Sequence, residues 1–257
     1  MTVADLHVHT TNSDGTLTLA TLPGAARRAG VETVAVTDHD RLHPALDQPV
    51  TMHDGIEVIH GIELRVDTGE FRVDLLGYGV EQTEEIRTLV NHLQTDRIER
   101  AREIVDRVEA ETGVTLDVTF EEGVGRPHIA RAIEDSNAPY DYKSAFEQLI
   151  ADGRPCYVPR DIPDFERGRD ILKDACGIVG LAHPFRYSDP PAALELVETL
   201  DAVERYYPYG HEVDESLLGE TVSRYDALVT GGSDAHEKEL GLAGLDDEEF
   251  DRLSAHI

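Results

Sequence analysis

The sequence predicts an α/β fold that carries a helical insertion. Short apolar runs alternate with helix-periodic segments in residues 1–81 and again in 166–257, whereas helical patterns dominate 82–165. Strands that alternate with helices are typical of a parallel sheet or a barrel. The 257 residues are enough for one barrel-sized domain with such an insertion.

The first α/β stretch begins with a predicted strand at Val3–Val8, which leads into the polar loop 9–15. A helix is expected at Leu17–Ala29, because its apolar residues follow the helical period and Gly30 comes directly after it. Three further apolar runs predict strands at Glu32–Thr37, Gly55–Leu64 and Phe71–Tyr78.

The middle segment is charged and helix-periodic. Its longest predicted helix is Thr83–Glu111, and shorter helical patterns follow at Arg126–Asp135 and Tyr142–Ile150. We therefore expect residues 82–165 to form a helical cap inserted into the α/β domain.

The α/β rhythm returns after the insertion. It completes a set of seven expected strands, with no internal repeat among them. Helices are predicted at Phe165–Ala175, Ala192–Leu200 and Val213–Tyr225, and strands at Ile178–Ala182, Ala202–Tyr206 and Ala227–Thr230.

The composition is strongly acidic. Asp and Glu number 52 against 23 Lys and Arg, giving a formal net charge of −29. Acidic residues spread over the whole chain predict a surface that stays hydrated in very high salt, as in the cytoplasm of an extreme halophile. The same charge disfavours binding to duplex nucleic acid. We expect neither a membrane span nor a secretory signal, and the two cysteines, Cys156 and Cys176, are predicted to be reduced thiols.

Histidines and acids collect where the predicted strands end. His7 and His9 are two residues apart, so on a strand both imidazoles point to one face and can reach one cation. Asp234 and His236 repeat this spacing after the last strand. Either pair alone could equally be solvated loop residues. In α/β barrels, however, the carboxyl ends of the strands carry the functional site.

Other candidate ligands come from separate segments of the chain. Each has an alternative reading, such as a turn or helix-capping role for an aspartate or an outward-facing position for Asp74. Together with the two pairs they supply about nine nitrogen and oxygen ligands without a thiolate, which suits two or three ions of Mn, Zn or Fe. These further candidates are Asp14, His39, Glu63, Asp74 and His183.

The motifs DLHVHTTNSDGT, TDHD, GIE, DLLGY, AHP and GGSDAH resemble, in this order, those of the PHP (polymerase and histidinol phosphatase) family. The resemblance spans nearly the whole chain. It implies a distorted (β/α)7 barrel, a trinuclear metal centre and phosphoesterase activity. The segments GRPHIAR and RPCYVPR resemble the cap of the nucleoside 3′,5′-bisphosphate phosphatase and 5′→3′ exoribonuclease branch.

The resemblance also distributes roles among residues. It implies one ion held by His7, His9, Glu63 and Asp234, a second by Glu63, Asp74 and His183, and a third by Asp14, His39 and His236. Position 74 departs from the family pattern, because relatives often have His there. Cap residues Arg126, Arg154 and Arg160 are expected to bind phosphate, and Asp38 or His128 to transfer protons.

The expected substrate is a 3′,5′-bisphosphonucleotide or the end of a short single-stranded RNA with a 5′-phosphate. The alternatives are a histidinol-phosphate-type phosphatase and a non-catalytic metal-binding module. Arg186, Glu204 and Tyr206 lie near strand ends and are weaker candidates for the site. The oligomeric state is not predicted.

Overall fold

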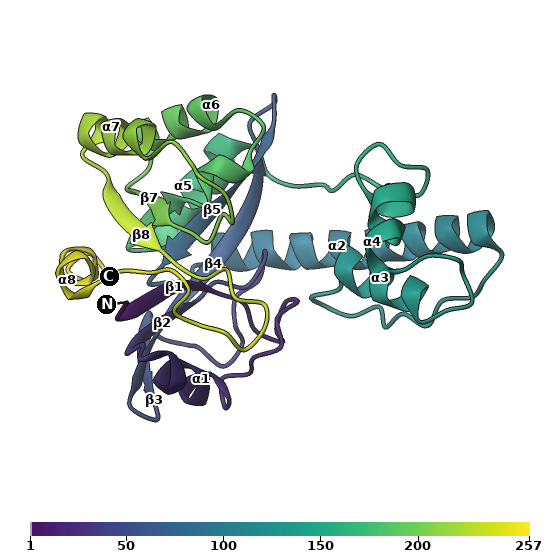
Figure 1. Ribbon diagram of the computed structural model, residues 1–257, viewed down its shortest axis with the longest axis horizontal. Helices are drawn as coiled ribbons and strands as arrows, with labels where there is room; N and C mark the ends of the chain where they lie inside the picture. Colours follow the sequence, from purple (N-terminus) through teal and green to yellow (C-terminus); the bar gives the residue numbers. More distant parts are fainter. Residues whose placement is uncertain (1) are drawn as a thin grey trace. The chain divides into compact units, whose positions relative to one another are not determined.

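The computed structural model describes residues 2–257, which form two compact units (Figure 1). One unit comprises the chain up to Thr88 together with Pro163–Ile257, and the other is Leu89–Ile162. The observed first border falls inside the helix α2 (Glu84–Thr112), since this helix runs from one unit into the other without a break. The sequence pattern placed this border where the helix begins.

The first unit is built on an eight-stranded sheet. Its order is β1-β2-β4-β5-β6-β7-β8, with β3 paired to β4 outside this path. Val8 also forms a parallel bridge with Ala235, just beyond β8, so the two ends of the sheet approach each other as in a barrel. The strands are β1 (Ala4–Val8), β2 (Thr33–Val36), β3 (Val50–His53), β4 (Ile56–Asp67), β5 (Arg72–Tyr78), β6 (Ile178–Leu181), β7 (Ala202–Tyr206) and β8 (Leu228–Gly231).

The sheet is mixed, which corrects the expectation of parallel strands alone. β1, β2 and β4 are parallel to one another, as are β6, β7 and β8, but β5 runs antiparallel to both of its neighbours. β4 and β5 are joined by a tight turn, in which Thr68 N–H donates to the Phe71 carbonyl at 2.9 Å and Gly69 has a φ of +89°. A parallel pair needs a crossover of a dozen or more residues, and this turn is far too short for one.

Helices cover the sheet at both ends of its strand order. In Figure 1, α1 (Leu22–Ala29) lies at the β2–β3 end, and α6 (Pro190–Glu195) and α7 (Glu215–Tyr225) lie at the β7–β8 end. The apolar face of α1 packs into a cluster with residues of β1, β2 and β4. The remaining helices of this unit are α5 (Phe165–Ala175) and α8 (Asp247–Ser254), with 3₁₀ turns at Pro184–Arg186 and Leu196–Thr199.

The second unit is helical and has its own hydrophobic core. Besides most of α2 it contains α3 (Arg126–Glu134), α4 (Tyr142–Ala145) and a π-helical turn, Phe146–Ile150. Apolar residues of α2, α3 and the π-helical turn are buried together in this core. Among the described residues, no helix is both long and apolar enough to cross a membrane.

Candidate metal centre

The nine side chains expected to bind metal come together in the first unit. Eight of them lie in three overlapping groups, and Asp234 lies beside one of these groups. Most of the nine are at or near strand ends, but Glu63, expected at the end of its strand, lies inside β4, which continues to Asp67. Two of these residues are held in the left-handed backbone region, with φ of +28° at His183 and +49° at Asp234. Such conformations are uncommon for residues other than glycine and collect at functional sites.

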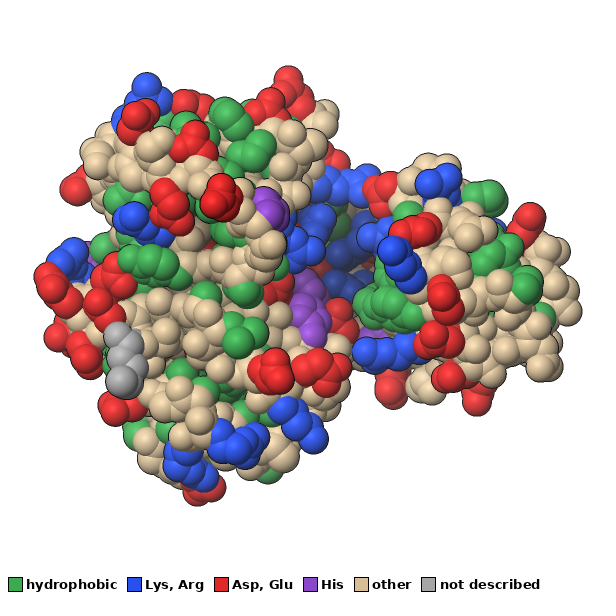
Figure 2. Space-filling model, in the orientation of Figure 1, with side chains coloured by type: hydrophobic (Ala, Val, Ile, Leu, Met, Phe, Trp, Pro, Cys, Tyr) green, Lys and Arg blue, Asp and Glu red, His purple; other side chains and the backbone are tan. Residues whose placement is uncertain are grey.

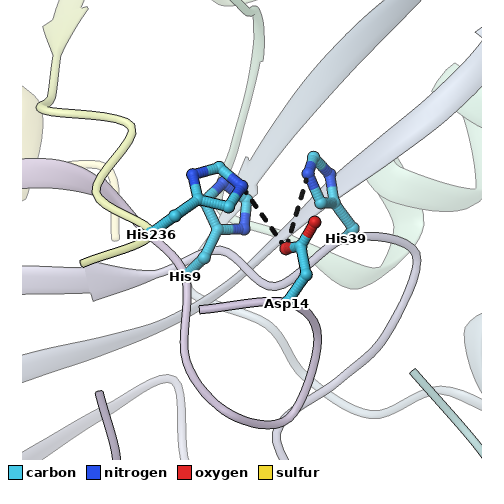
Figure 3. A group of neighbouring side chains, drawn as sticks. All are labelled: His9, Asp14, His39 and His236. Carbon is cyan, nitrogen blue, oxygen red and sulfur yellow. Dashed lines mark ion pairs between the residues drawn. The ribbon is translucent and has the colours of Figure 1, made fainter. Parts of the chain in front are cut away.

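The first group is drawn in Figure 3 and comprises His9, Asp14, His39 and His236. The Asp14 carboxylate points toward two imidazoles, with Oδ1 at 3.3 Å from Nε2 of His236 and 3.9 Å from Nε2 of His39. The His9 ring lies 4.3 Å from each of these two rings, centroid to centroid. Ligands about 2.1 Å from one ion lie roughly 3–3.5 Å from each other, so this group has nearly the spacing of a coordination shell.

The second group comprises His7, His9 and Glu63, with Asp234 beside it. The Nε2 atoms of the two histidines are each 3.5 Å from a Glu63 oxygen. They are 3.6 Å and 3.1 Å from Oδ1 of Asp234. Three potential ligand atoms therefore lie within 4.8 Å of one another, and the Asp234 oxygen is close to both imidazoles.

The third group comprises Glu63, Asp74 and His183. His183 Nε2 is 3.0 Å from Oε1 of Glu63 and 3.6 Å from Oδ2 of Asp74. Asp74 also pairs with Arg65, whose Nε lies 2.5 Å from Oδ1 and whose Nη2 donates to Oδ2 at 2.7 Å. This pair could not be predicted from the sequence, because it depends on the register of two antiparallel strands.

Three acids of the cluster, Asp14, Glu63 and Asp234, have lowered pKa values and are held ionised. Burial alone would raise the pKa of Glu63, but the charges of His39 and His7 outweigh it and bring the pKa well below its usual range. The pKa values of Asp14 and Asp234 are also lowered, because nearby histidines outweigh the effect of burial. Such a concentration of ionised acids favours cations.

Two buried nitrogen atoms show that the cluster fits metal ions. Among the described residues, neither Nε2 of His7 nor Nδ1 of His9 has a hydrogen-bond partner, although both side chains are fully buried. Burial lowers the pKa of His7, yet the carboxylates of Glu204, Glu63 and Asp234 together raise it well above 6.5. A divalent cation would provide the missing partner of Nε2 of His7 and would replace the proton that these acids attract.

Glu204 supports the cluster from behind. Its Oε1 lies 2.9 Å from Nδ1 of His7, and its Oε2 accepts the backbone N–H of His183 at 2.7 Å. A carboxylate on the far nitrogen fixes the tautomer and direction of a metal-binding imidazole. Its place near a strand end made Glu204 only a weak candidate in the sequence, since the two contacts come from distant segments.

Asp5 was missed by the sequence analysis. It is fully buried in β1, and its carboxylate accepts from Ser233 N–H, Ser233 Oγ and Gly241 N–H at 2.6–2.8 Å. These bonds fasten the loop that carries Asp234 and His236 to the first strand.

Asp38, expected to transfer protons, is fully buried and organises the loop after β1. It accepts hydrogen bonds from Thr10 N–H and Oγ, from Ser13 Oγ and from Asn12 Nδ2, at 2.7–3.1 Å. These contacts hold the loop that contains Asp14. A catalytic role for Asp38 stays a prediction.

Arg186 and Tyr207 hold the outer oxygen of Asp234. Tyr207 donates its hydroxyl to Oδ2 at 2.8 Å, and Nη1 of Arg186 donates to the same atom at 3.1 Å. Arg186 is about half exposed, at 53 % of its side chain, so it also faces solvent at the edge of the cluster.

The other predicted residues lie in the second unit. Arg126 forms an ion pair with Asp152 at 2.9 Å, and Arg154 is exposed. Burial and then the charges of Arg126 and Arg160 lower the pKa of Arg100 to about 10, so three guanidiniums lie close together here. His128 Nδ1 accepts the Gly125 N–H at 3.2 Å and so helps to begin α3. Phosphate binding and proton transfer by these residues stay predictions.

The sheet is barrel-like, and imidazoles and carboxylates gather near the ends of its strands. This arrangement is typical of metal-dependent hydrolases. The family model of the PHP domain matches residues 5–151. The chain therefore belongs to the PHP family, as the motifs predicted.

Three curated relatives are similar to this chain over most of its length. A phosphoribosyl 1,2-cyclic phosphate 1,2-diphosphodiesterase from Eggerthella lenta is 31% identical, over 92% of this chain and 95% of its own. A 3′,5′-nucleoside bisphosphate phosphatase from Chromobacterium violaceum is 29% identical, over 71% of this chain and 67% of its own. The 5′-3′ exoribonuclease Rnm of Escherichia coli is also 29% identical, over 72% of this chain and 67% of its own.

A solved structure agrees with the fold. A candidate metal-dependent phosphoesterase from Bifidobacterium adolescentis superposes with a TM-score of 0.81 at 25% identity. The match covers 98% of this chain and 96% of that one. The expected barrel-like fold with a helical insertion is thereby confirmed.

Proposed function

We propose that the protein is a metal-dependent phosphoesterase that hydrolyses phosphate esters of nucleotides, namely 3′,5′-bisphosphonucleotides or the 5′-phosphorylated ends of short RNA. The observation that carries this proposal is the cluster of five imidazoles and four carboxylates at ligand-to-ligand distances, with no thiolate in any of its three groups. Mixed nitrogen and oxygen ligation suits Mn first, with Zn or Fe as alternatives.

Bound divalent ions would lower the pKa of a water molecule and stabilise the charge of the transition state. The protein's own part is to place ligands and substrate. Glu204 and Asp5 hold the ligand segments rigid from behind. Arg186, about half exposed beside Asp234, is suited to contact a phosphate oxygen at the edge of the cluster.

The substrate class is supported by what the relatives share. Their names describe a phosphoribosyl cyclic diester, a nucleoside bisphosphate and RNA, all of which carry phosphate on ribose. Arg126, Arg154 and Arg160 are our candidates for phosphate contacts, and Asp38 or His128 for proton transfer. A phosphoribosyl cyclic phosphate is the second candidate substrate, because the similarity to that relative spans 92% of the chain.

The acidic composition supports a further part of the proposal, that the protein works in the cytoplasm of an extreme halophile. With a net charge of −29, screening by concentrated salt would relieve self-repulsion without removing tightly liganded ions.

A substrate panel in high salt with Mn²⁺ tests the activity. It should contain a 3′,5′-bisphosphonucleotide, a short 5′-phosphorylated RNA, a phosphoribosyl 1,2-cyclic phosphate and histidinol phosphate. We expect release of phosphate or nucleotide from the first two, and preference for histidinol phosphate would contradict the proposal. His183→Ala should lower turnover at least about 100-fold, whereas the exposed His256→Ala should leave it unchanged. Bound ions without turnover of any of these substrates would instead indicate the non-catalytic metal-binding module.

A further inference from the structure

Arg65 and Asp74 face each other across the antiparallel pair of β4 and β5. Nη2 of Arg65 donates a hydrogen bond to Oδ2 of Asp74 at 2.7 Å, and Nε lies 2.5 Å from Oδ1 as an ion pair without hydrogen-bond geometry. The Asp74 side chain is only 2 % exposed, so its negative charge is buried and needs a positive partner. A hydrogen bond between two charged groups is about twice as strong as one between neutral groups, so the guanidinium is a firm counter-charge for Asp74.

The pair leaves the third group short of ligands. If Asp74 is engaged by Arg65, only Glu63 and His183 remain there for a cation, and Glu63 is shared with the second group. A stable site for a first-row divalent metal usually has three or four protein ligands. The first and second groups reach that number without Asp74.

The formal charge of the cluster also favours two bound ions over three. Five carboxylates (Asp14, Glu63, Asp74, Glu204 and Asp234) and two guanidiniums (Arg65 and Arg186) give the cluster a formal charge of −3 with neutral histidines. Two divalent ions bring it to +1, which already favours an anionic substrate, whereas a third would add two further positive charges without a third full set of ligands.

We propose that the Arg65 guanidinium takes the place of a third ion, so that the protein binds two divalent ions and uses Arg65 as the fixed positive charge beside Glu63, Asp74 and His183. This inference rests on the proposed function and makes it more specific, since it assigns a two-ion centre to this chain. The Arg65 side chain is 40 % exposed, so part of it is in contact with solvent.

The test is the number of ions per chain, measured by elemental analysis after loading with Mn²⁺ and removal of excess metal. We expect two ions in the unchanged protein and three in Arg65→Met. Removing the guanidinium leaves the buried Asp74 carboxylate without its counter-charge, a state that strongly favours binding of a cation. In the double variant Arg65→Met/Asp74→Asn the number should return to two, because the added ion depends on the Asp74 carboxylate.

A matched control exists on the same pair of strands. Arg72 lies opposite Asp67 in the register and pairs with it at 3.7 Å, two pairs further from the cluster. Arg72→Met should leave the number of ions at two. Asp74→His provides a second route to the result, because a neutral histidine cannot form the ion pair with Arg65. This variant should raise the number to three even if Arg65→Met does not fold.

The outcomes separate this inference from the proposed function. Three ions in the unchanged protein, or two in both Arg65→Met and Asp74→His, overturn the role of Arg65 and leave the phosphoesterase proposal standing. Two ions without turnover of any phosphate ester overturn the proposed activity and leave the two-ion centre standing. No ions at all overturn both.

Discussion

Glu204 shows how one buried residue can govern the metal centre without touching an ion. It receives a hydrogen bond from the His183 backbone and pairs with Nδ1 of His7, so it orients two of the proposed ligands at once. Glu204→Gln keeps the shape, but its amide cannot accept both contacts with full charge. We expect metal affinity to fall by about 10–100-fold with little change in fold, as is usual for residues that orient ligands.

Competition against a metal-binding dye measures that loss directly. Glu220→Gln, an exposed glutamate in α7, is the matched control and should bind metal like the unchanged protein. Equal affinities for Glu204→Gln and the control would contradict the orienting role.

His60 predicts how stability changes with pH. It is fully buried in β4, and burial, with a smaller effect of His43, lowers its pKa from 6.5 to about 4. The folded state therefore resists protonation of this ring between pH 6.5 and 4, while the unfolded chain takes up the proton. The free energy of unfolding should fall as pH drops through this window, by at most about 3 kcal/mol.

Denaturant titrations at pH 7.5 and 4.5 check this. His60→Leu, which has no titrating group, should lose less stability on acidification than the unchanged protein. His92→Leu, whose histidine is 54 % exposed, should behave like the unchanged protein. If acid weakens His60→Leu and the unchanged protein equally, His60 is not the cause.

At the scale of the elements, the contact between α5 and β4 depends on Gly168. A Cβ added there would lie 2.5 Å from Cγ1 of Val66, a distance that real Cβ atoms do not adopt. Gly219 occupies the middle of α7, a helix of the same length, but an added Cβ meets nothing within 4 Å. Substitutions at these two glycines therefore distinguish the effect of packing against β4 from the effect of helix propensity.

Gly168→Ala should lower the free energy of unfolding by about 1–3 kcal/mol, because overpacking against β4 exceeds the gain in helix propensity. Gly219→Ala should raise it by about 0.5–1 kcal/mol, because only the propensity changes. Chemical denaturation of both variants measures these differences. Equal stabilisation of the two would show that α5 can move away from the sheet at little cost.

The helices and strands also show which parts of this fold could be predicted from the sequence. The strand at Ala202–Tyr206 and the helix at Phe165–Ala175 were predicted at their observed bounds, because strong apolar periodicity defines them. β3 was missed, since its side chains are half exposed and Met52 is 64 % exposed, which leaves no buried pattern. The antiparallel direction of β5 was missed as well. The alternation of strands with helices predicts parallel strands and does not indicate that β4 and β5 form a hairpin.

The candidate site was predictable for a related reason. Ligands such as His7 and His9 are visible as motifs at strand ends, and the barrel topology brings those ends together. Arg65, Asp5 and Glu204 were not foreseen in their roles, because their partners are set by register and long-range packing rather than by neighbours in the chain.

The whole molecule carries its charge over both units. Figure 2 shows Asp and Glu side chains scattered across the visible face of each unit, with no single acidic block. Excess acids near one another repel, and this repulsion acts on the compact state more than on the expanded unfolded chain. A net charge of −29 on 257 residues should therefore weaken the fold wherever screening is poor.

Salt changes this repulsion in a predictable direction. The Debye length falls from about 30 Å at 0.01 M salt to about 3 Å at 1 M, so most repulsion between surface acids disappears over that range. We expect the melting temperature to rise by on the order of 10 °C between 0.01 M and 2 M KCl, which corresponds to several kcal/mol in a protein of this size. Differential scanning calorimetry with a chelator present separates this effect from metal binding, and replacement of KCl by an uncharged osmolyte of equal osmolarity separates it from general exclusion of cosolute. A melting temperature that rises as much with the osmolyte as with KCl would contradict screening as the cause, and one that falls with KCl would contradict adaptation of this acidic surface to high salt.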